Sequence, residues 1–115
     1  MSKILFSFLI ILCTKHLNAQ SQGYACIYSK GLCGGATASG ERLNCEKLTA
    51  AHKTFKLGSK VRVTNMDNSK SVVVRINDRG PYSKKLIIDL SPAAAKAIGL
   101  TYQKGITKVK IVKIS

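Results

Sequence analysis

One segment near the middle of the chain, residues 60–77, limits the fold more than any other. Polar and apolar residues alternate on both sides of a short turn, Met66–Ser69, that is rich in Asn, Asp and Ser. This pattern predicts a β-hairpin with one apolar face. The residues expected to share that face are Val61, Val63, Val72, Val74 and Ile76.

Three further segments have the character of short strands. Gly23–Tyr28 and Leu86–Leu90 are short and mainly apolar, and in Ile106–Ile114 the apolar residues Val109 and Ile111 alternate with lysines. The glycine-rich stretch Gly31–Gly35 between the first strand and the hairpin must turn.

A single short helix is expected after the Leu86–Leu90 strand. Ser91 is suited to the N-cap, Pro92 to the first helical position, and Gly99 to a left-handed C-terminal cap. The helix should therefore span Pro92–Ile98. Many short strands, one helix and glycine-bearing turns favour an all-β fold closed into a small barrel, because closure removes exposed sheet edges.

The first 19 residues are typical of a secretory signal peptide. Lys3 precedes an apolar run, Ile4–Leu12, that is too short to anchor the chain across a bilayer. A buried strand or helix is disfavoured because nothing amphipathic alternates there. Cys13 does not follow a small residue, which disfavours lipoprotein anchoring. We expect a signal peptide over residues 1–19, one domain over residues 20–115, and a periplasmic or extracellular location without a stable membrane anchor.

The predicted domain is strongly basic. Removing residues 1–19 takes away Lys3 and Lys15, so 17 of the 19 basic residues and all five acidic residues remain, giving a net charge of +12. Such a domain attracts anionic surfaces. Because no basic stretch is interleaved with aromatic residues, and an exported protein meets envelope polymers first, the charge favours anionic envelope polymers over nucleic acid.

Three cysteines, Cys26, Cys33 and Cys45, remain after residue 19, so one disulfide at most can form within the chain. The sequence does not choose the pair; a Cys26–Cys45 bridge, for example, would add about 3 kcal/mol on the chain-entropy account. A zinc site formed with His52 is disfavoured because the paired spacing of structural zinc sites is missing. No metal and no other cofactor is expected.

Four spaced motifs carry a resemblance to a known family. They are Thr37–Glu41 (TASGE), Leu48–His52 (LTAAH), Val72–Pro81 (VVVRINDRGP) and Ile87–Ser91 (IIDLS). In this order they resemble the rare lipoprotein A family of bacterial septal-ring lytic transglycosylases, from about Gly23 to the C-terminus. Four spaced motifs arise by chance far less readily than one. The resemblance implies a six-stranded double-psi β-barrel, as in expansins, with a polysaccharide groove across one face.

The same resemblance implies an enzyme. Lytic transglycosylases cut the bond between N-acetylmuramic acid and N-acetylglucosamine in peptidoglycan, and the C6 hydroxyl of the muramic acid attacks to give a 1,6-anhydro product. An internal nucleophile relaxes the usual need for two carboxyl groups. We therefore expect an endolytic peptidoglycan lytic transglycosylase, a lyase that acts in wall remodelling or daughter-cell separation, monomeric, with glycan strands as its partner.

Among the five acidic residues that remain, the resemblance implies that Asp78 is the general acid and base, with Glu41 and His52 as active-site supports. Taken alone, Asp78 would be a turn-forming aspartate and His52 a structural histidine. A general acid must hold a proton, yet Arg75 and Arg79 flank Asp78 and favour its charged form. We therefore expect that Asp78 shares its proton with a second carboxylate, either Glu41 or Asp89.

Further residues are candidates for binding the substrate. Asp89 precedes a Leu-Ser pair similar to the one that follows an essential aspartate in expansins and related endoglucanases; this resemblance implies a functional role, and the alternative is that Asp89 tethers the start of the helix. Sugars stack on aromatic rings, and Tyr28 and Tyr82 are the rings available near the motifs. Arg75, Asn77 and Arg79 could hydrogen-bond sugar hydroxyls, N-acetyl oxygens or the muramyl carboxylate, although Arg75 could equally be a solvated strand residue.

Two other functions remain open on the sequence. One is a non-catalytic, expansin-like or morphogenetic protein that binds peptidoglycan without cutting it. The other is a small basic protein that acts on membranes, which the charge and a free cysteine would suit but the complete motif set argues against.

Overall fold

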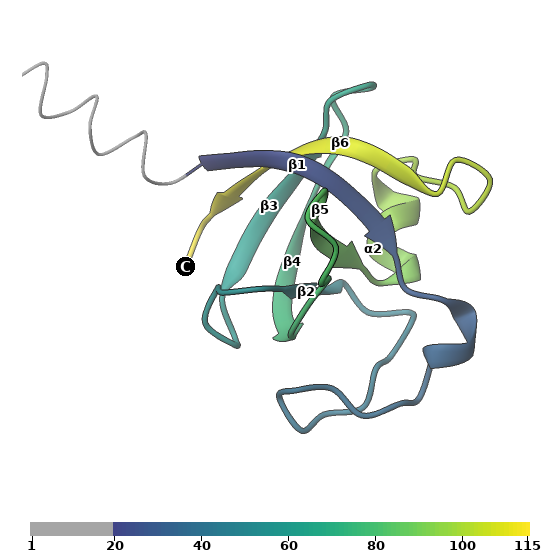
Figure 1. Ribbon diagram of the computed structural model, residues 1–115, viewed down its shortest axis with the longest axis vertical. Coiled ribbons are helices and arrows are strands. Elements are labelled where there is room, and N and C mark those ends of the chain that lie inside the picture. The colour runs from purple at the N-terminus through teal and green to yellow at the C-terminus, as the bar shows by residue number, and fades with distance from the viewer. Residues whose placement is uncertain (1–19) are drawn as a thin grey trace, which may run out of the picture.

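The computed structural model describes residues 20–115, so the predicted signal peptide and Cys13 lie outside the described residues. Six strands and one short α-helix follow one another along the chain (Figure 1). The strands are β1 (Gln20–Ile27), β2 (Thr49–His52), β3 (Lys60–Asn65), β4 (Ser71–Asp78), β5 (Leu86–Leu90) and β6 (Ile106–Lys113). The helices are α2 (Pro92–Ala97) and a 3-10 turn, η1 (Lys30–Leu32).

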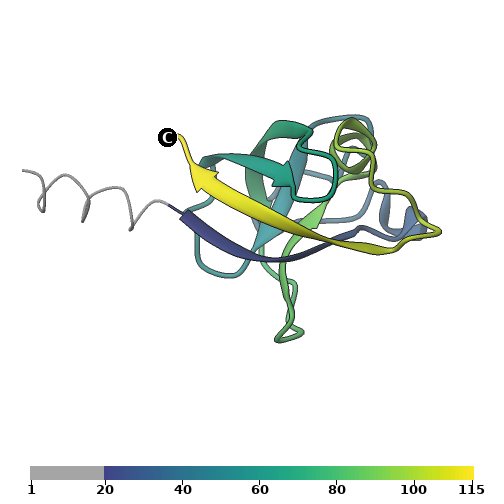
Figure 2. The same cartoon turned by 90° about the horizontal axis from the view of Figure 1, so that it is seen from above.

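The strands close into a barrel in the order β1-β5-β2-β4-β3-β6. The pairs β1–β5 and β2–β4 are parallel, and the other four pairs are antiparallel. The loop between β4 and β5 stands out from the barrel when it is seen from above (Figure 2). This is the all-β, six-stranded barrel with one short helix that the sequence predicts.

The hairpin and the core are placed as expected. In β3 and β4, Val61 pairs with Val74 and Val63 with Val72, and the turn lies between Asn65 and Ser71. Val109 and Ile111 of β6 are fully buried. The barrel interior is filled mainly by β-branched and alanine side chains, which suit the inward positions of closely spaced strands.

The sequence pattern alone gives no strand at β2, because Thr49–His52 has no alternation and two alanines. All four of its residues are buried, since β2 lies between β4 and β5 and is covered on both faces. The strand forms through its pairing on both edges. Tertiary context therefore overrides a weak local preference.

Helix α2 is fixed at both ends by side chains from other parts of the barrel. Ser91 is the N-cap as predicted: its Oγ accepts from the backbone N–H of Ala94 and donates to the carbonyl of Lys47. At the other end, the side-chain amides of Asn65 and Asn68 both donate to the carbonyl of Ile98. The helix ends one residue earlier than predicted, and Gly99 has the left-handed backbone (φ 73°) expected of a C-terminal cap.

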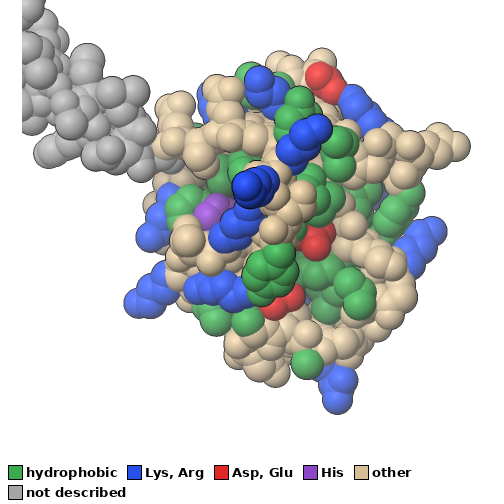
Figure 3. Space-filling view, viewed as in Figure 1, with side chains coloured by type: hydrophobic (Ala, Val, Ile, Leu, Met, Phe, Trp, Pro, Cys, Tyr) green, Lys and Arg blue, Asp and Glu red, His purple; other side chains and the backbone are tan. Residues whose placement is uncertain are grey.

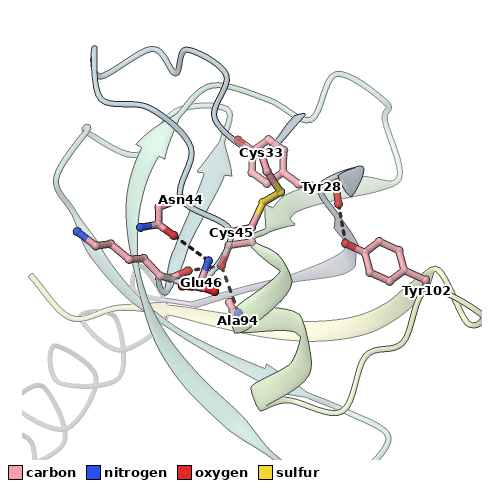
Figure 4. Close-up of a disulfide and its surroundings, with 9 residues drawn as sticks. Tyr28, Cys33, Asn44, Cys45, Glu46, Ala94 and Tyr102 are labelled. Carbon is pink, nitrogen blue, oxygen red and sulfur yellow. Dashed lines mark hydrogen bonds between the residues drawn. A yellow bond between two sulfur atoms is a disulfide. The ribbon is translucent and has the colours of Figure 1, made fainter. Parts of the chain in front are cut away.

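A disulfide joins Cys33 to Cys45, and Cys26 is a free thiol. The sequence leaves the pair open, and the structure pairs Cys33 with Cys45 rather than Cys26 with Cys45. The bond closes the long loop between β1 and β2, and Figure 4 shows it beside the ring of Tyr28. Because this loop carries the TASGE motif, the disulfide limits how far the motif can move.

Replacing both Cys33 and Cys45 by Ser should lower the free energy of unfolding by about 2–3 kcal/mol, because a short closed loop no longer restricts the unfolded chain. Urea unfolding followed by circular dichroism measures this loss. Cys26→Ser is the matched control, which keeps the disulfide and should retain most of the stability. An unchanged urea midpoint in the double variant would show that the bridge contributes nothing.

Candidate active site

Two carboxylates lie on one row of residues that crosses four strands. Cys26 of β1 pairs with Asp89 of β5, Asp89 pairs with Ala51 of β2, and Ala51 pairs with Asp78 of β4. Residues opposite one another in neighbouring strands point to the same side of a sheet. Asp78 and Asp89 therefore share one face of the barrel, with backbones two strand spacings apart, about 10 Å.

The small side chain of Ala51 makes this arrangement possible. Ala51 is only 2% exposed and packs with Tyr28 and Leu43, both buried, and with Cys45. The disulfide loop thus folds over the middle of the row, between the two carboxylates. A larger residue at position 51 would push Tyr28 away from Asp78.

Asp78 is held in a fixed orientation by three donors. The hydroxyl of Tyr28 donates to its Oδ2 at 2.6 Å, and the backbone N–H groups of Ala38 and Arg79 donate to its Oδ1, each at 2.9 Å. Burial, followed by the hydrogen bond to Asp78, raises the pKa of Tyr28, so its phenol remains a donor. The Ala38 contact comes from the TASGE loop, so this loop and the end of β4 form a single site.

Glu41 forms a second cluster beside Asp78. Its carboxylate makes an ion pair with Arg75 (2.7 Å from Nη1 to Oε1) and accepts a hydrogen bond from Nδ2 of Asn77 at 2.7 Å. These two donors, Arg75 first, lower the pKa of Glu41. The side chain of Glu41 thus contacts Arg75 and Asn77. This geometry does not support a proton shared between Glu41 and Asp78.

Asp89 is in a different environment from Glu41. Burial is the main cause that raises its pKa to about 6; the neighbouring thiol of Cys26 opposes the shift and the charge of Asp78 adds to it. Its Oδ1 atom is buried and has no hydrogen-bond partner among residues 20–115. Burial and the same carboxylate raise the pKa of the Cys26 thiol to about 12. Glu41 and Asp89 are the two carboxylates expected as partners for Asp78. Of these, Asp89 is the one whose pKa is raised in part by the charge of Asp78.

His52 and Arg79 lie at the edge of the site. His52 pairs with Ile88, a core residue, and its ring stacks on Phe55 with centroids 3.9 Å apart. Its Nδ1 accepts from the backbone N–H groups of Thr54 and Phe55. Burial, and then the charges of Arg79 and Lys53, lower the pKa of His52, so its ring is neutral near pH 7. Nη1 of Arg79 donates to the carbonyls of His52 and Phe55.

The residues predicted to bind sugar differ in their exposure to solvent. Tyr28 is buried (6% exposed) and holds Asp78, and Asn77 is buried and bonded to Glu41. Tyr82 is 85% exposed on the projecting loop, so its ring is free to stack on a sugar. A hollow of about 660 Å³ borders the site, and Glu41, Arg42, Asn44 and Glu46 are among its lining residues. Figure 3 shows basic side chains scattered over one face, with few acidic ones among them.

No three His, Cys, Asp or Glu side chains among residues 20–115 lie close enough together to hold a metal ion. No helix in this part of the chain is long and apolar enough to cross a membrane.

The closed six-stranded barrel with two parallel pairs belongs to the class of expansin-like double-psi β-barrels. A Clavibacter michiganensis expansin has this fold with a TM-score of 0.67 and 21% identity, over 84% of this chain and 50% of that chain. A papain inhibitor from Streptomyces has a TM-score of 0.64 and 22% identity, over 84% of this chain and 94% of that chain. At these identities the likeness concerns the fold alone.

Within this class, residues 20–111 match the lytic transglycolase family, and the chain belongs to that family. The endolytic peptidoglycan transglycosylase RlpA of Haemophilus influenzae is 51% identical over 90 residues, which are 78% of this chain and 31% of that protein. The protein of the same name from Pseudomonas aeruginosa is 52% identical over 89 residues, 77% of this chain and 26% of that protein. This chain thus spans about a third or less of the length of these relatives.

Parts of the site could not be found from the sequence. The backbone N–H of Ala38 leaves no trace in the residue pattern, and the role of Tyr28 as a donor to Asp78 depends on a contact 50 positions apart. The position of Cys26 beside Asp89 follows from a parallel pairing that only the closed barrel defines. The motifs contain Asp78, Glu41 and Asp89; Asp78 and Asp89 lie on one row, Glu41 contacts Asn77 next to Asp78, and their roles stay predictions.

The raised pKa of Asp89 predicts how stability depends on pH. A folded-state pKa of about 6 lies above the ordinary 3.8. The carboxyl therefore contributes fully to the stability of the fold below pH 3.8, and this contribution is lost as the pH rises through 6. Relative to wild type, Asp89→Asn should therefore have a higher free energy of unfolding at pH 8 than at pH 4. The difference between the two pH values should be about 1 kcal/mol after allowance for solvent screening. Urea unfolding at both pH values measures the difference.

Asp67→Asn is the matched control, because the pKa of Asp67 is lowered by its hydrogen bonds to Lys104 and Thr107. Its contribution is present above pH 3.8 and is lost on acidification, so this variant should lose stability at pH 8. If the two variants respond to pH in the same direction, the burial argument for Asp89 is wrong.

Proposed function

We propose that this domain is an endolytic peptidoglycan lytic transglycosylase that cleaves the N-acetylmuramic acid to N-acetylglucosamine bond with formation of 1,6-anhydro-N-acetylmuramic acid. The single observation that carries the proposal is the arrangement of Asp78, held by three donors on a row that it shares with Asp89. Membership of the lytic transglycolase family and the names of the relatives support the same activity. Such a function places the domain in the cell envelope, which suits a signal peptide in residues 1–19.

In the proposed reaction, the carboxyl of Asp78 gives its proton to the glycosidic oxygen as the bond from C1 breaks. The C6 hydroxyl of the same muramic acid forms the new bond to C1, and its proton passes to the Asp78 carboxylate. The carboxyl is thereby restored, and no water enters the reaction. The hydrogen bond that the Tyr28 hydroxyl donates to Asp78 keeps this carboxyl group in one orientation during both proton transfers.

Asp89 supplies the second charge in this proposal. When Asp89 is ionised, its negative charge stabilises the positive charge that develops on the sugar ring. Glu41 is fixed by Arg75 and Asn77 and lines the hollow beside the site. Its proposed role is to accept hydrogen bonds from sugar hydroxyls. His52 and Arg79 hold the end of β2 against the end of β4, so their proposed role is to position Asp78.

Asp78→Asn should reduce the release of anhydro-muramyl products by about 10²-fold or more, because the variant has no group that can give and collect a proton. Mass spectrometry of purified glycan strands, with and without stem peptides, measures these products. Asp67→Asn makes the same chemical change in the hairpin turn outside the site and should cleave like wild type. Thermal unfolding of both variants verifies that they fold.

If wild type binds the glycan strands and releases no anhydro-sugar, the enzymatic proposal fails and the expansin-like wall-binding role replaces it. Equal product release by wild type and Asp78→Asn would leave cleavage in place but remove Asp78 from it.

The proposed pairing of Asp78 and Asp89 predicts the pH dependence. Activity should rise with pH through about 6, because Asp89 ionises in that range. In Asp89→Asn this inflection in kcat/KM should disappear and the remaining activity should be lower. Glu41→Gln should lower activity but keep the inflection, because the pKa of Glu41 is lowered and its titration lies at more acid pH. An inflection that survives in Asp89→Asn would assign it to another group.

A further inference from the structure

A group of cations lies on the outer face of strands β3 and β6, away from the row of carboxylates. Along β3 the exposed Lys60 and Arg62 alternate with buried valines, and along β6 Lys108 and Lys110 alternate with Val109 and Ile111. The two strands are antiparallel neighbours, and Lys110 pairs with Thr64, two residues from Arg62. We call Lys60, Arg62, Lys108 and Lys110 the basic stripe.

The charge of the stripe is not neutralised within the described chain. The ion pairs in residues 20–115 are Arg75–Glu41 and Lys104–Asp67, and neither includes a stripe residue. The other acidic residues, Glu46, Asp78 and Asp89, lie on the disulfide loop and on the site row. Cross-strand neighbours lie roughly 5–8 Å apart, so four like charges at such spacings repel one another. A bound anion would relieve this repulsion.

The stripe continues to the edge of the candidate active site. Lys60 of β3 pairs with Arg75 of β4, which in turn holds Glu41. The cations thus run as one line from β6 across β3 to Arg75. A long chain lying along this line could occupy the stripe without entering the row of Asp78 and Asp89.

We propose that the basic stripe binds a linear envelope polymer that carries a phosphate group on each repeat. Cations at roughly 5–8 Å intervals along a line suit repeated single charges on a flexible chain. A flat bilayer would touch only the crest of a closed, curved barrel. Stacking of successive nucleic-acid bases needs several rings among the cations. The neighbours of these cations on β3 and β6 include Thr64, Met66 and Val112, and one ring, Tyr24 of β1, pairs with Lys108. The choice of an envelope polymer rests on the proposed function, but binding itself requires no cleavage.

Fluorescence anisotropy with labelled poly(glycerol phosphate) at low and at physiological salt tests the proposal. Arg62→Gln/Lys110→Gln removes two charges from the middle of the stripe and should weaken binding roughly 10- to 30-fold, with a shallower dependence on salt. Lys84→Gln/Lys96→Gln is the matched control: both residues are exposed, and they lie on the β4–β5 loop and on α2. It removes the same charge and should weaken binding less than about threefold.

Equal weakening in the two double variants would show that binding follows net charge alone and would overturn the stripe. Tighter, stripe-dependent binding to anionic phospholipid vesicles or to single-stranded DNA would overturn the choice of polymer. Asp78→Asn should bind poly(glycerol phosphate) like wild type. If wild type binds the polymer through the stripe but releases no anhydro-sugar, the proposed function alone fails; if wild type releases anhydro-sugar but its polymer binding does not depend on the stripe, the stripe alone fails.

Discussion

The double pairing of β2 is the constraint on which the fold and the candidate site both depend. This strand of four residues lies between β4 in parallel and β5 in antiparallel orientation, and it joins the two halves of the barrel. The same pairing sets Asp78 and Asp89 on opposite sides of Ala51. The small side chain of Ala51 leaves room for Tyr28, whose hydroxyl holds Asp78. A change in the register of β2 would therefore have two effects at once: it would move Asp78 and Asp89 out of their common row, and it would disrupt the pairing that closes the barrel.

The electrostatics of the site is local, although the domain is strongly basic. Arg75 is bound to Glu41, and Arg79 donates to two backbone carbonyls, so the two arginines nearest Asp78 in the sequence are engaged elsewhere. Asp89 is raised in pKa mainly by burial, with a smaller contribution from Asp78. Three carboxyl groups in one small region thus have three environments: one ion-paired, one buried and one hydrogen-bonded to a phenol and two amides. Environments that differ in this way allow carboxyl groups to take different roles.

Much of the barrel could be predicted from the sequence because alternation and turn chemistry act locally. The β3–β4 hairpin, β5, α2 and β6 follow from alternating valines, an Asx-rich turn and a Ser-Pro cap, each of which depends on neighbours in the chain. Strand β2 has no such signal, and its family motif was the one indication that the segment mattered. The choice of Cys33–Cys45 and the contacts of Ala38 and Tyr28 depend on closure of the barrel, which no local pattern encodes.

The burial of Tyr28 bears on how the domain would hold the glycan strand proposed as its substrate. A ring that is 6% exposed cannot stack on a sugar, so of the two tyrosines predicted to do so only Tyr82, on the projecting loop, is exposed enough. One stacking contact contributes only about 1 kcal/mol, which is too little to hold a long polymer. In the proposed complex, polar contacts at Glu41 and electrostatic attraction to lysines and arginines outside the ion pairs would supply most of the affinity. Because electrostatic attraction is screened by salt whereas an aromatic stack is not, the proposed binding of this domain to an anionic envelope polymer would depend on ionic strength more than its proposed chemistry would.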